Sequence, residues 1–225
     1  MMPSTIERSQ PNTIQIIFRS ALAAVICLAG FIGFPFWYGL LAYLLPDSIG
    51  NMLERWLPGE VLAHNWLPIS IIGGALWGWQ LSRILSHPYT WRFISACGVG
   101  VGIGQVLATG QIQRLIHPFF AGAPFHIWFA IQFLIGIGAV VIMTAVALGV
   151  ALWSWRVAVT LALVGSVATI IPAFAILFLM DTLGMRVGAG HANMARVMVL
   201  GFLFATMAGG AVFGWILKSL LAHES

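Results

Sequence analysis

The sequence predicts an all-α integral membrane protein, and three observations support this fold class. Only 7% of the 225 residues are charged, whereas charged residues make up roughly a quarter of a soluble domain. The mean hydropathy is +0.99, and no polar stretch is long enough to form a separate soluble domain. The apolar runs are continuous and do not alternate, which favours helices over a transmembrane β-barrel. We therefore expect residues 1–225 to form a single transmembrane domain.

A membrane-spanning helix needs roughly 20 apolar residues, and the chain contains several segments of about this length. They cover residues 21–45, 66–85, 93–113, 125–152, 157–180 and 197–221, which predicts six spans. The first is much longer than the ~7–15-residue apolar core of a cleavable signal peptide, so we expect it to be retained. Pro35 and Pro172 fall inside spans, where each should bend its helix.

The basic residues set the predicted orientation. On the side of the N-terminus they are Arg8, Arg19, Arg83, Arg92, Arg156 and Lys218; on the other side they are Arg55, Arg114, Arg186 and Arg196. The other side also carries the acids Asp47, Glu54, Glu60 and Asp181. Because cytoplasmic loops hold the excess of Lys and Arg, we expect both termini to be cytoplasmic. The basic residues are scattered singly, so the net charge of +4 does not indicate a nucleic-acid partner.

Two longer loops are expected on the outer side. In residues 46–65 the apolar side chains recur at helical spacing, which predicts a short amphipathic helix on the outer membrane surface. Residues 181–196 are rich in glycine and are expected to form an irregular loop. Most tryptophans lie near the ends of spans, as interfacial anchors do; these are Trp37, Trp56, Trp66, Trp77, Trp79, Trp91, Trp153, Trp155 and Trp215.

A repeated block indicates an internal duplication. Residues 73–85 read GGALWGWQLSRIL and residues 209–221 read GGAVFGWILKSLL, with seven of thirteen positions identical. Related tetrapeptides, DSIG at 47–50 and DTLG at 181–184, precede the two blocks. The first two spans thus resemble the last two in the same membrane orientation, which predicts a parallel hairpin repeat. Whether the two middle spans form a third copy stays open.

Glycines four residues apart recur in three of the predicted spans. The pairs are Gly74/Gly78, Gly98/Gly102, Gly100/Gly104 and Gly210/Gly214. Such spacing forms a groove on one helix face that lets another backbone approach closely. We interpret these pairs as helix-packing faces, either within the chain or against a second chain.

A few polar groups lie well inside the predicted spans. Gln105, Thr109 and Gln113 form a stripe on one helix face, and Gln132 lies at similar depth in the next span. They can join two helices by hydrogen bonds, or Gln105, Thr109 and Gln132 can line a solute path. No charged residue or histidine lies near the middle of any span, which argues against an ion-coupled transporter.

The outer boundary gathers histidines that are weak candidates for a metal site. His64, His117, His126 and His191 lie there beside Glu60 and Asp181. His64, His117, His191 and Asp181 are the metal-ligand candidates, although their spacing matches no zinc motif. Cys27 and Cys97 lie in apolar runs and are read as packing residues. No catalytic motif is present, and no cofactor is expected.

These observations favour a non-catalytic polytopic membrane protein. We expect a membrane-embedded subunit that assembles through its glycine-rich helix faces, as a homo-oligomer or with other membrane subunits, in the lipid bilayer. A permease or channel for a small or apolar solute is the alternative. A metal-dependent membrane enzyme with its site at the outer face is a third hypothesis.

Overall fold

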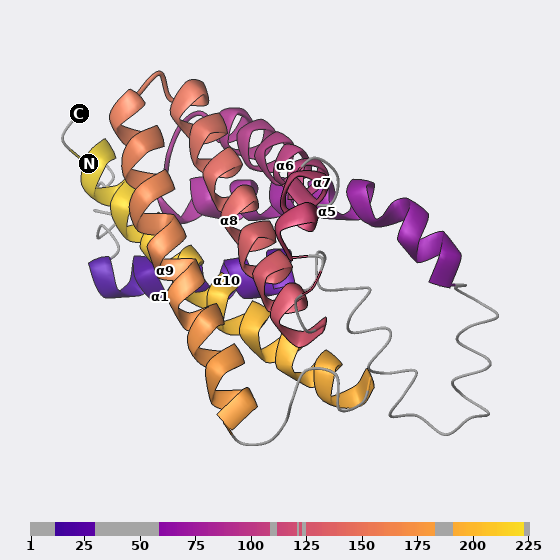
Figure 1. Ribbon diagram of the computed structural model, residues 1–225. Helices are drawn as coiled ribbons and strands as arrows, with labels where there is room; N and C mark the ends of the chain where they lie inside the picture. The colour runs from indigo at the N-terminus through magenta and orange to yellow at the C-terminus, as the bar shows by residue number, and fades with distance from the viewer. Residues whose placement is uncertain are drawn as a thin grey trace, which may run out of the picture.

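The computed structural model describes residues 12–29, 59–108, 112–120, 122, 125–182 and 191–222 (Figure 1). Helix α1 (Thr13–Ala24) continues as the π-helical turn η1 (Val25–Ala29). The other helices are α5 (Gly59–Ile84), α6 (Thr90–Val106), α7 (Ile112–Phe120), α8 (Phe125–Ala151), α9 (Trp155–Thr182) and α10 (His191–Leu221). The described residues contain no strand, so the all-α fold class is confirmed for this part of the chain.

Three helices are long and apolar enough to cross a membrane. The segments are Ala130–Ala151, Trp155–Leu179 and Val199–Leu221, within α8, α9 and α10. Thr13–Ala29 is also apolar but shorter. Because a soluble domain does not expose helices of this length and hydropathy, the chain is a membrane protein with transmembrane helices.

Several helix boundaries differ from the prediction. Helix α1 begins at Thr13 and α5 at Gly59, both ahead of the apolar runs that marked them. Helix α10 begins at His191, inside the expected loop 181–196. Hydropathy marks where a run becomes apolar, whereas a helix continues through polar residues while its backbone hydrogen bonds are kept. Pro35, most of the predicted amphipathic helix in residues 46–65 and the DSIG tetrapeptide lie outside the described residues.

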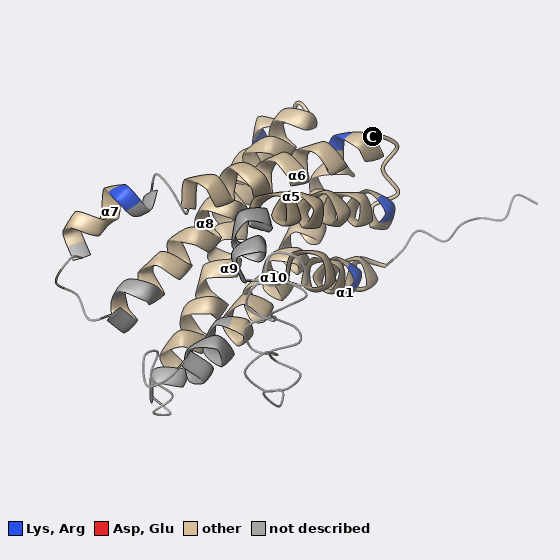
Figure 2. Cartoon of the chain, turned by 90° about the vertical axis from the view of Figure 1, so that its right-hand side faces the viewer, with Lys and Arg blue, Asp and Glu red and all other residues tan. Residues whose placement is uncertain are grey.

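The third predicted span reaches past the end of α6. Helix α6 ends at Val106, residues 107–108 continue as a π-helical turn, and helix α7 is described from Ile112. Leu115 and Phe119 lie four residues apart on α7, and both are exposed. Figure 2 shows α7 lying off the bundle, beyond the end of α8. Residues 109–111, between the two segments, lie outside the described residues.

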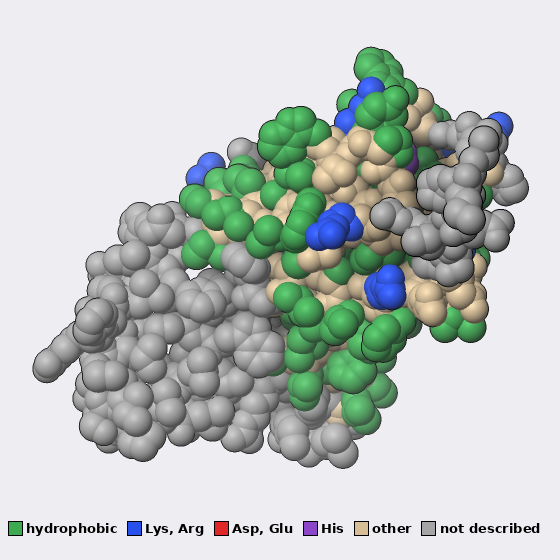
Figure 3. All heavy atoms as spheres, turned by 180° about the vertical axis from the view of Figure 1, so that it is seen from behind, with side chains coloured by type: hydrophobic (Ala, Val, Ile, Leu, Met, Phe, Trp, Pro, Cys, Tyr) green, Lys and Arg blue, Asp and Glu red, His purple; other side chains and the backbone are tan. Residues whose placement is uncertain are grey.

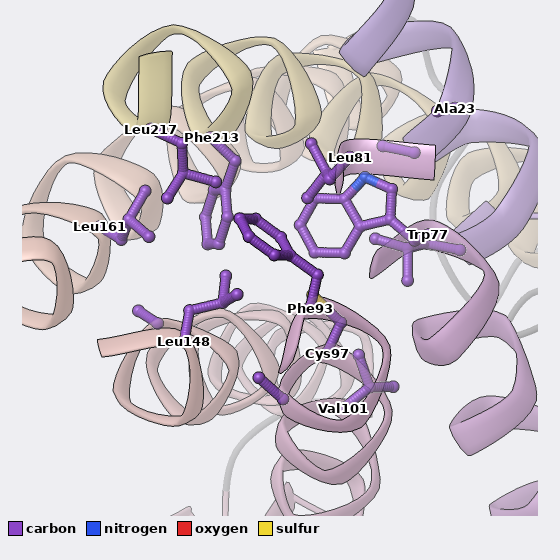
Figure 4. Close-up of a cluster of buried hydrophobic side chains, with 14 of the residues drawn as sticks. Ala23, Trp77, Leu81, Phe93, Cys97, Val101, Leu148, Leu161, Phe213 and Leu217 are labelled. Carbon is purple, nitrogen blue, oxygen red and sulfur yellow. The ribbon is translucent and has the colours of Figure 1, made fainter. Parts of the chain in front are cut away.

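The remaining helices pack in a closed cycle. Helix α1 packs on α5 and α10, α5 packs on α6, α6 on α8, α8 on α9, and α9 on α10. One buried cluster takes side chains from every helix of the cycle (Figure 4), including Trp77, Phe93, Leu148, Leu161 and Phe213. This cluster lies toward the end of the bundle where α5 and α8 finish and α6 and α9 begin.

The turns at that end share one geometry. Ser86, after α5, and Trp153, after α8, have positive φ values of 52° and 54°. Behind them, His87 N donates to Ser82 O and Ser154 N donates to Gly149 O, each at 2.9 Å. This pattern is the Schellman motif, which satisfies the last carbonyls of a helix. Both turns can therefore reverse the chain within a few residues.

Candidate functional site

The first glycine pair lies in the contact between α5 and α6. A methyl group placed on Gly74 would lie 2.6 Å from the carbonyl oxygen of Cys97 and 2.9 Å from Val101. On Gly78 it would overlap the carbonyl group of Phe93. Because the nearest obstacle at each position is a backbone carbonyl oxygen, only glycine permits this approach of the two helices.

The second glycine pair makes the same kind of contact between α10 and α1. A methyl group on Gly210 would overlap Ala24 and lie 2.7 Å from the carbonyl oxygen of Ser20. On Gly214 it would overlap the hydroxyl group of Ser20. The neighbours of this pair on α1 recur every four residues (Ile16, Ser20 and Ala24), as do those of the first pair on α6 (Phe93, Cys97 and Val101).

The glycines of α6 serve two opposite faces. Gly98 and Gly102 approach α5, where a methyl group on Gly102 would lie 2.7 Å from Ile71. Gly100 and Gly104 approach α8, where methyl groups would lie 2.5 Å from the Cα atoms of Thr144 and Val140. Residues two apart on a helix point to nearly opposite sides, so the run GVGVGIG places α6 between two close neighbours.

The equivalent aromatic residues of the repeated blocks meet in the core. Trp77 and Phe213 occupy the same place in the two blocks, and their ring centroids are 5.2 Å apart. Trp77 is only 3% exposed, so its prediction as an interfacial anchor is wrong. Since α5 continues for two more turns to Ile84, Trp77 lies inside the bundle. Trp79, Trp91, Trp153, Trp155 and Trp215 are exposed.

The two glutamines predicted inside the spans differ in burial. Gln105 is 7% exposed, and Gln132 is half-buried on α8. Thr109 lies outside the described residues, as does the side chain of Gln113. Thr144, Thr169 and Thr206 each donate to a carbonyl one turn earlier in their own helix. The hydroxyl groups of these threonines are therefore satisfied within their own helices.

The predicted metal ligands are not brought together within the described part of the chain. His117 is exposed on α7. The side chains of His64, His191 and Asp181 lie outside the described residues. Among the residues that can be placed, no group of three His, Cys, Asp or Glu side chains could hold an ion.

Basic side chains gather at the end of the bundle that holds the core. Arg19, Arg83, Arg92 and Arg156 are exposed there, and Lys218 Nζ donates to Thr13 Oγ1 at 3.2 Å. Figure 2 shows this end near the C-terminus, whereas the basic residue of α7 lies at the opposite end. Figure 3 shows basic side chains set among hydrophobic ones on one face of the bundle. The Asp and Glu side chains of the chain all lie outside the part whose side chains are described.

His87 lies in the α5–α6 turn under the influence of Arg92. Partial burial and the positive charge of Arg92 lower the pKa of His87 below its ordinary value. Its ring centroid lies 5.6 Å from that of Tyr89 and 5.1 Å from that of Phe93. Between about pH 6.5 and the lowered folded pKa, the unfolded chain binds more protons at His87 than the folded chain does. The protein therefore loses stability as the pH falls through this range.

Replacing Arg92 with glutamine should therefore raise the pKa of His87 toward the ordinary value. The rise should be partial, because burial remains. An NMR titration of the imidazole signals in detergent micelles would measure it. Arg156→Gln, at the same end but on α9, should leave the His87 titration unchanged. An unaltered pKa in Arg92→Gln would show that the charge of Arg92 does not act on His87.

No protein-family model, curated protein or solved structure matches the chain. The fold and the packing faces define its class: a helical integral membrane protein whose glycines hold helices of the same chain together.

Proposed function

We propose that the chain is a six-span membrane protein with both termini on the cytoplasmic side. The contact cycle supports six spans, because α1, α5 and α6 pack among α8, α9 and α10 as members of one bundle. The hydrogen bond from Lys218 to Thr13 supports a common side for the two termini, because it joins the end of α10 to the start of α1. The exposed arginines at that end support a cytoplasmic location.

The architecture contains a parallel hairpin repeat of the first two and the last two spans, in which α5 and α10 hold equivalent places. The glycine blocks support this proposal, because Gly74/Gly78 on α5 and Gly210/Gly214 on α10 receive partner residues at the same four-residue spacing.

Its function is that of a non-catalytic, membrane-embedded subunit. The observation that carries this proposal is the core that takes side chains from every helix of the cycle and fills the basic end of the bundle. The described glycine faces are occupied by helices of the same chain, so a partner subunit would have to bind a different surface. One such surface is the apolar face of helix α9, where the exposed side chains are Leu163, Val167, Ile171, Phe174 and Phe178.

Purification from native membranes in a mild detergent tests this function. We expect a homo-oligomer or a stoichiometric membrane partner, identified by mass spectrometry of the complex. The buried Gln105 supports a permease as the second candidate. A monomer that carries a small neutral solute such as glycerol across proteoliposome membranes would favour the permease and overturn the subunit.

A further inference from the structure

Two arginines flank the turn between α5 and α6. Arg83 lies in the last turn of α5, and Arg92 lies in the first turn of α6. The guanidinium carbon of Arg83 lies 5.1 Å from the ring centroid of Trp79, and that of Arg92 lies 4.4 Å from the ring centroid of Tyr89. Stacking uses the face of a guanidinium group and leaves the N–H donors at its edge available for an acceptor.

Within the described residues, neither arginine has an acceptor. Both side chains are exposed, and neither makes a hydrogen bond or an ion pair there. The further arginines Arg19 and Arg156 are exposed at the same end. An anion that neutralises Arg83 and Arg92 would therefore have to come from outside the described residues.

The aromatic residues around the turn place it at the level of lipid headgroups. Tyr89 and Trp91 are exposed beside the two arginines, and Trp153 and Trp155 are exposed at the neighbouring α8–α9 turn. Exposed Trp and Tyr side chains form belts at the membrane–water interface. The phosphates of the adjacent leaflet are at this depth, and arginine binds phosphate oxygens through two parallel hydrogen bonds.

We propose that the α5–α6 turn binds the phosphate of an anionic phospholipid through Arg83 and Arg92. The positive charge of Arg83 and Arg92, which no described residue neutralises, selects a headgroup with net negative charge, such as phosphatidylglycerol, over zwitterionic phosphatidylcholine. Trp79 and Tyr89 hold the guanidinium groups in place, so little side-chain freedom is lost on binding. This site is independent of the subunit and permease proposals, because it concerns the lipid and not the partner or the solute.

Lipid titration of the purified full-length chain tests the site. In nonionic detergent, native mass spectrometry would follow binding of short-chain phosphatidylglycerol and phosphatidylcholine. We expect the wild type to prefer phosphatidylglycerol. Arg83→Gln and Arg92→Gln should each weaken its binding about fivefold, and the double variant about 25-fold, which corresponds to ~1 kcal/mol for each basic residue. Binding of phosphatidylcholine should change little.

Two control variants separate a specific loss of lipid binding from a general loss of charge or of folding. Arg114→Gln removes an exposed arginine from α7, at the opposite end, and should keep the preference for phosphatidylglycerol. The Arg83→Lys/Arg92→Lys double variant keeps the charge, so it should fold and lose less affinity than the glutamine pair. An unchanged affinity in both double variants would overturn the site, as would an equal loss for phosphatidylcholine. Displacement of the lipid by millimolar glycerol phosphate would assign the site to a free phosphate instead.

Discussion

Alanine at Gly78 should destabilise the bundle severely, and leucine there should abolish folding. The added methyl group overlaps the carbonyl group of Phe93 and lies 2.9 Å from the Cβ atom of Cys97. A carbonyl group cannot rotate away within a helix, so all of α6 would have to shift. Gly100 and Gly104 hold α6 against α8 on its other side, which resists that shift. We expect Gly78→Ala to lower the free energy of unfolding by about 3 kcal/mol.

An SDS titration followed by far-UV circular dichroism would measure this loss. Gly136→Ala is the matched control, because its methyl group would lie at an ordinary 3.8 Å from the Cβ atom of Ala108. Its free energy of unfolding should stay within about 0.5 kcal/mol of the wild type. Equal stability of the two variants would contradict the close contact of α5 and α6.

The second glycine block allows a stricter form of the same test. A methyl group on Gly214 meets mainly the side chain of Ser20, with the carbonyl oxygen of Ile16 at 3.6 Å. Ser20→Gly should therefore restore much of the stability that Gly214→Ala loses, with a coupling energy of about 1–3 kcal/mol. No side-chain change at Phe93 should rescue Gly78→Ala, because the obstacle there is backbone. Rescue of neither variant, or of both, would show that the contacts differ from those described.

Local periodicity explains which features could be predicted from the sequence. The fold class follows from long apolar runs, and the glycine pairs follow from a four-residue spacing on one helix face. The partner of each glycine pair depends on tertiary contacts. Gly210 and Gly214 pack on α1, from the other end of the chain, and no local signal indicates that neighbour.

Two features were missed for identifiable reasons. Helix α7 was missed because its first residues, 112–113, were counted in the third predicted span. The helical spacing of Ile112, Leu115, Ile116 and Phe119 was a usable signal. Trp77 was assigned to the interface by residue type, although the repeat aligns it with Phe213. A phenylalanine needs no polar partner, so this alignment already favoured a buried position.

Alanine at Trp77 should open a cavity in the buried cluster that joins the helices. Trp77 is 3% exposed and Phe213 is 2% exposed, and their rings contact each other. In a bilayer the unfolded helices are already in an apolar solvent, so the main loss is of packing contacts around the cavity. We expect Trp77→Ala and Phe213→Ala each to lower the free energy of unfolding by about 3 kcal/mol, the low end of the range for soluble cores.

Trp77→Phe separates packing from polarity at the same position. The indole Nε1 of Trp77 is buried and has no hydrogen-bond partner among the described residues, and such an unsatisfied group costs about 1–3 kcal/mol. Removing it offsets the smaller ring, so Trp77→Phe should stay within about 1 kcal/mol of the wild type. Trp215→Ala, on the exposed face of α10, should also change stability little in the same SDS titration. If Trp77→Phe were as damaging as Trp77→Ala, the indole N–H would have a partner that this packing does not contain. If Trp77→Ala lowered the free energy of unfolding as little as Trp215→Ala, the buried cluster would not be what holds the helix cycle together.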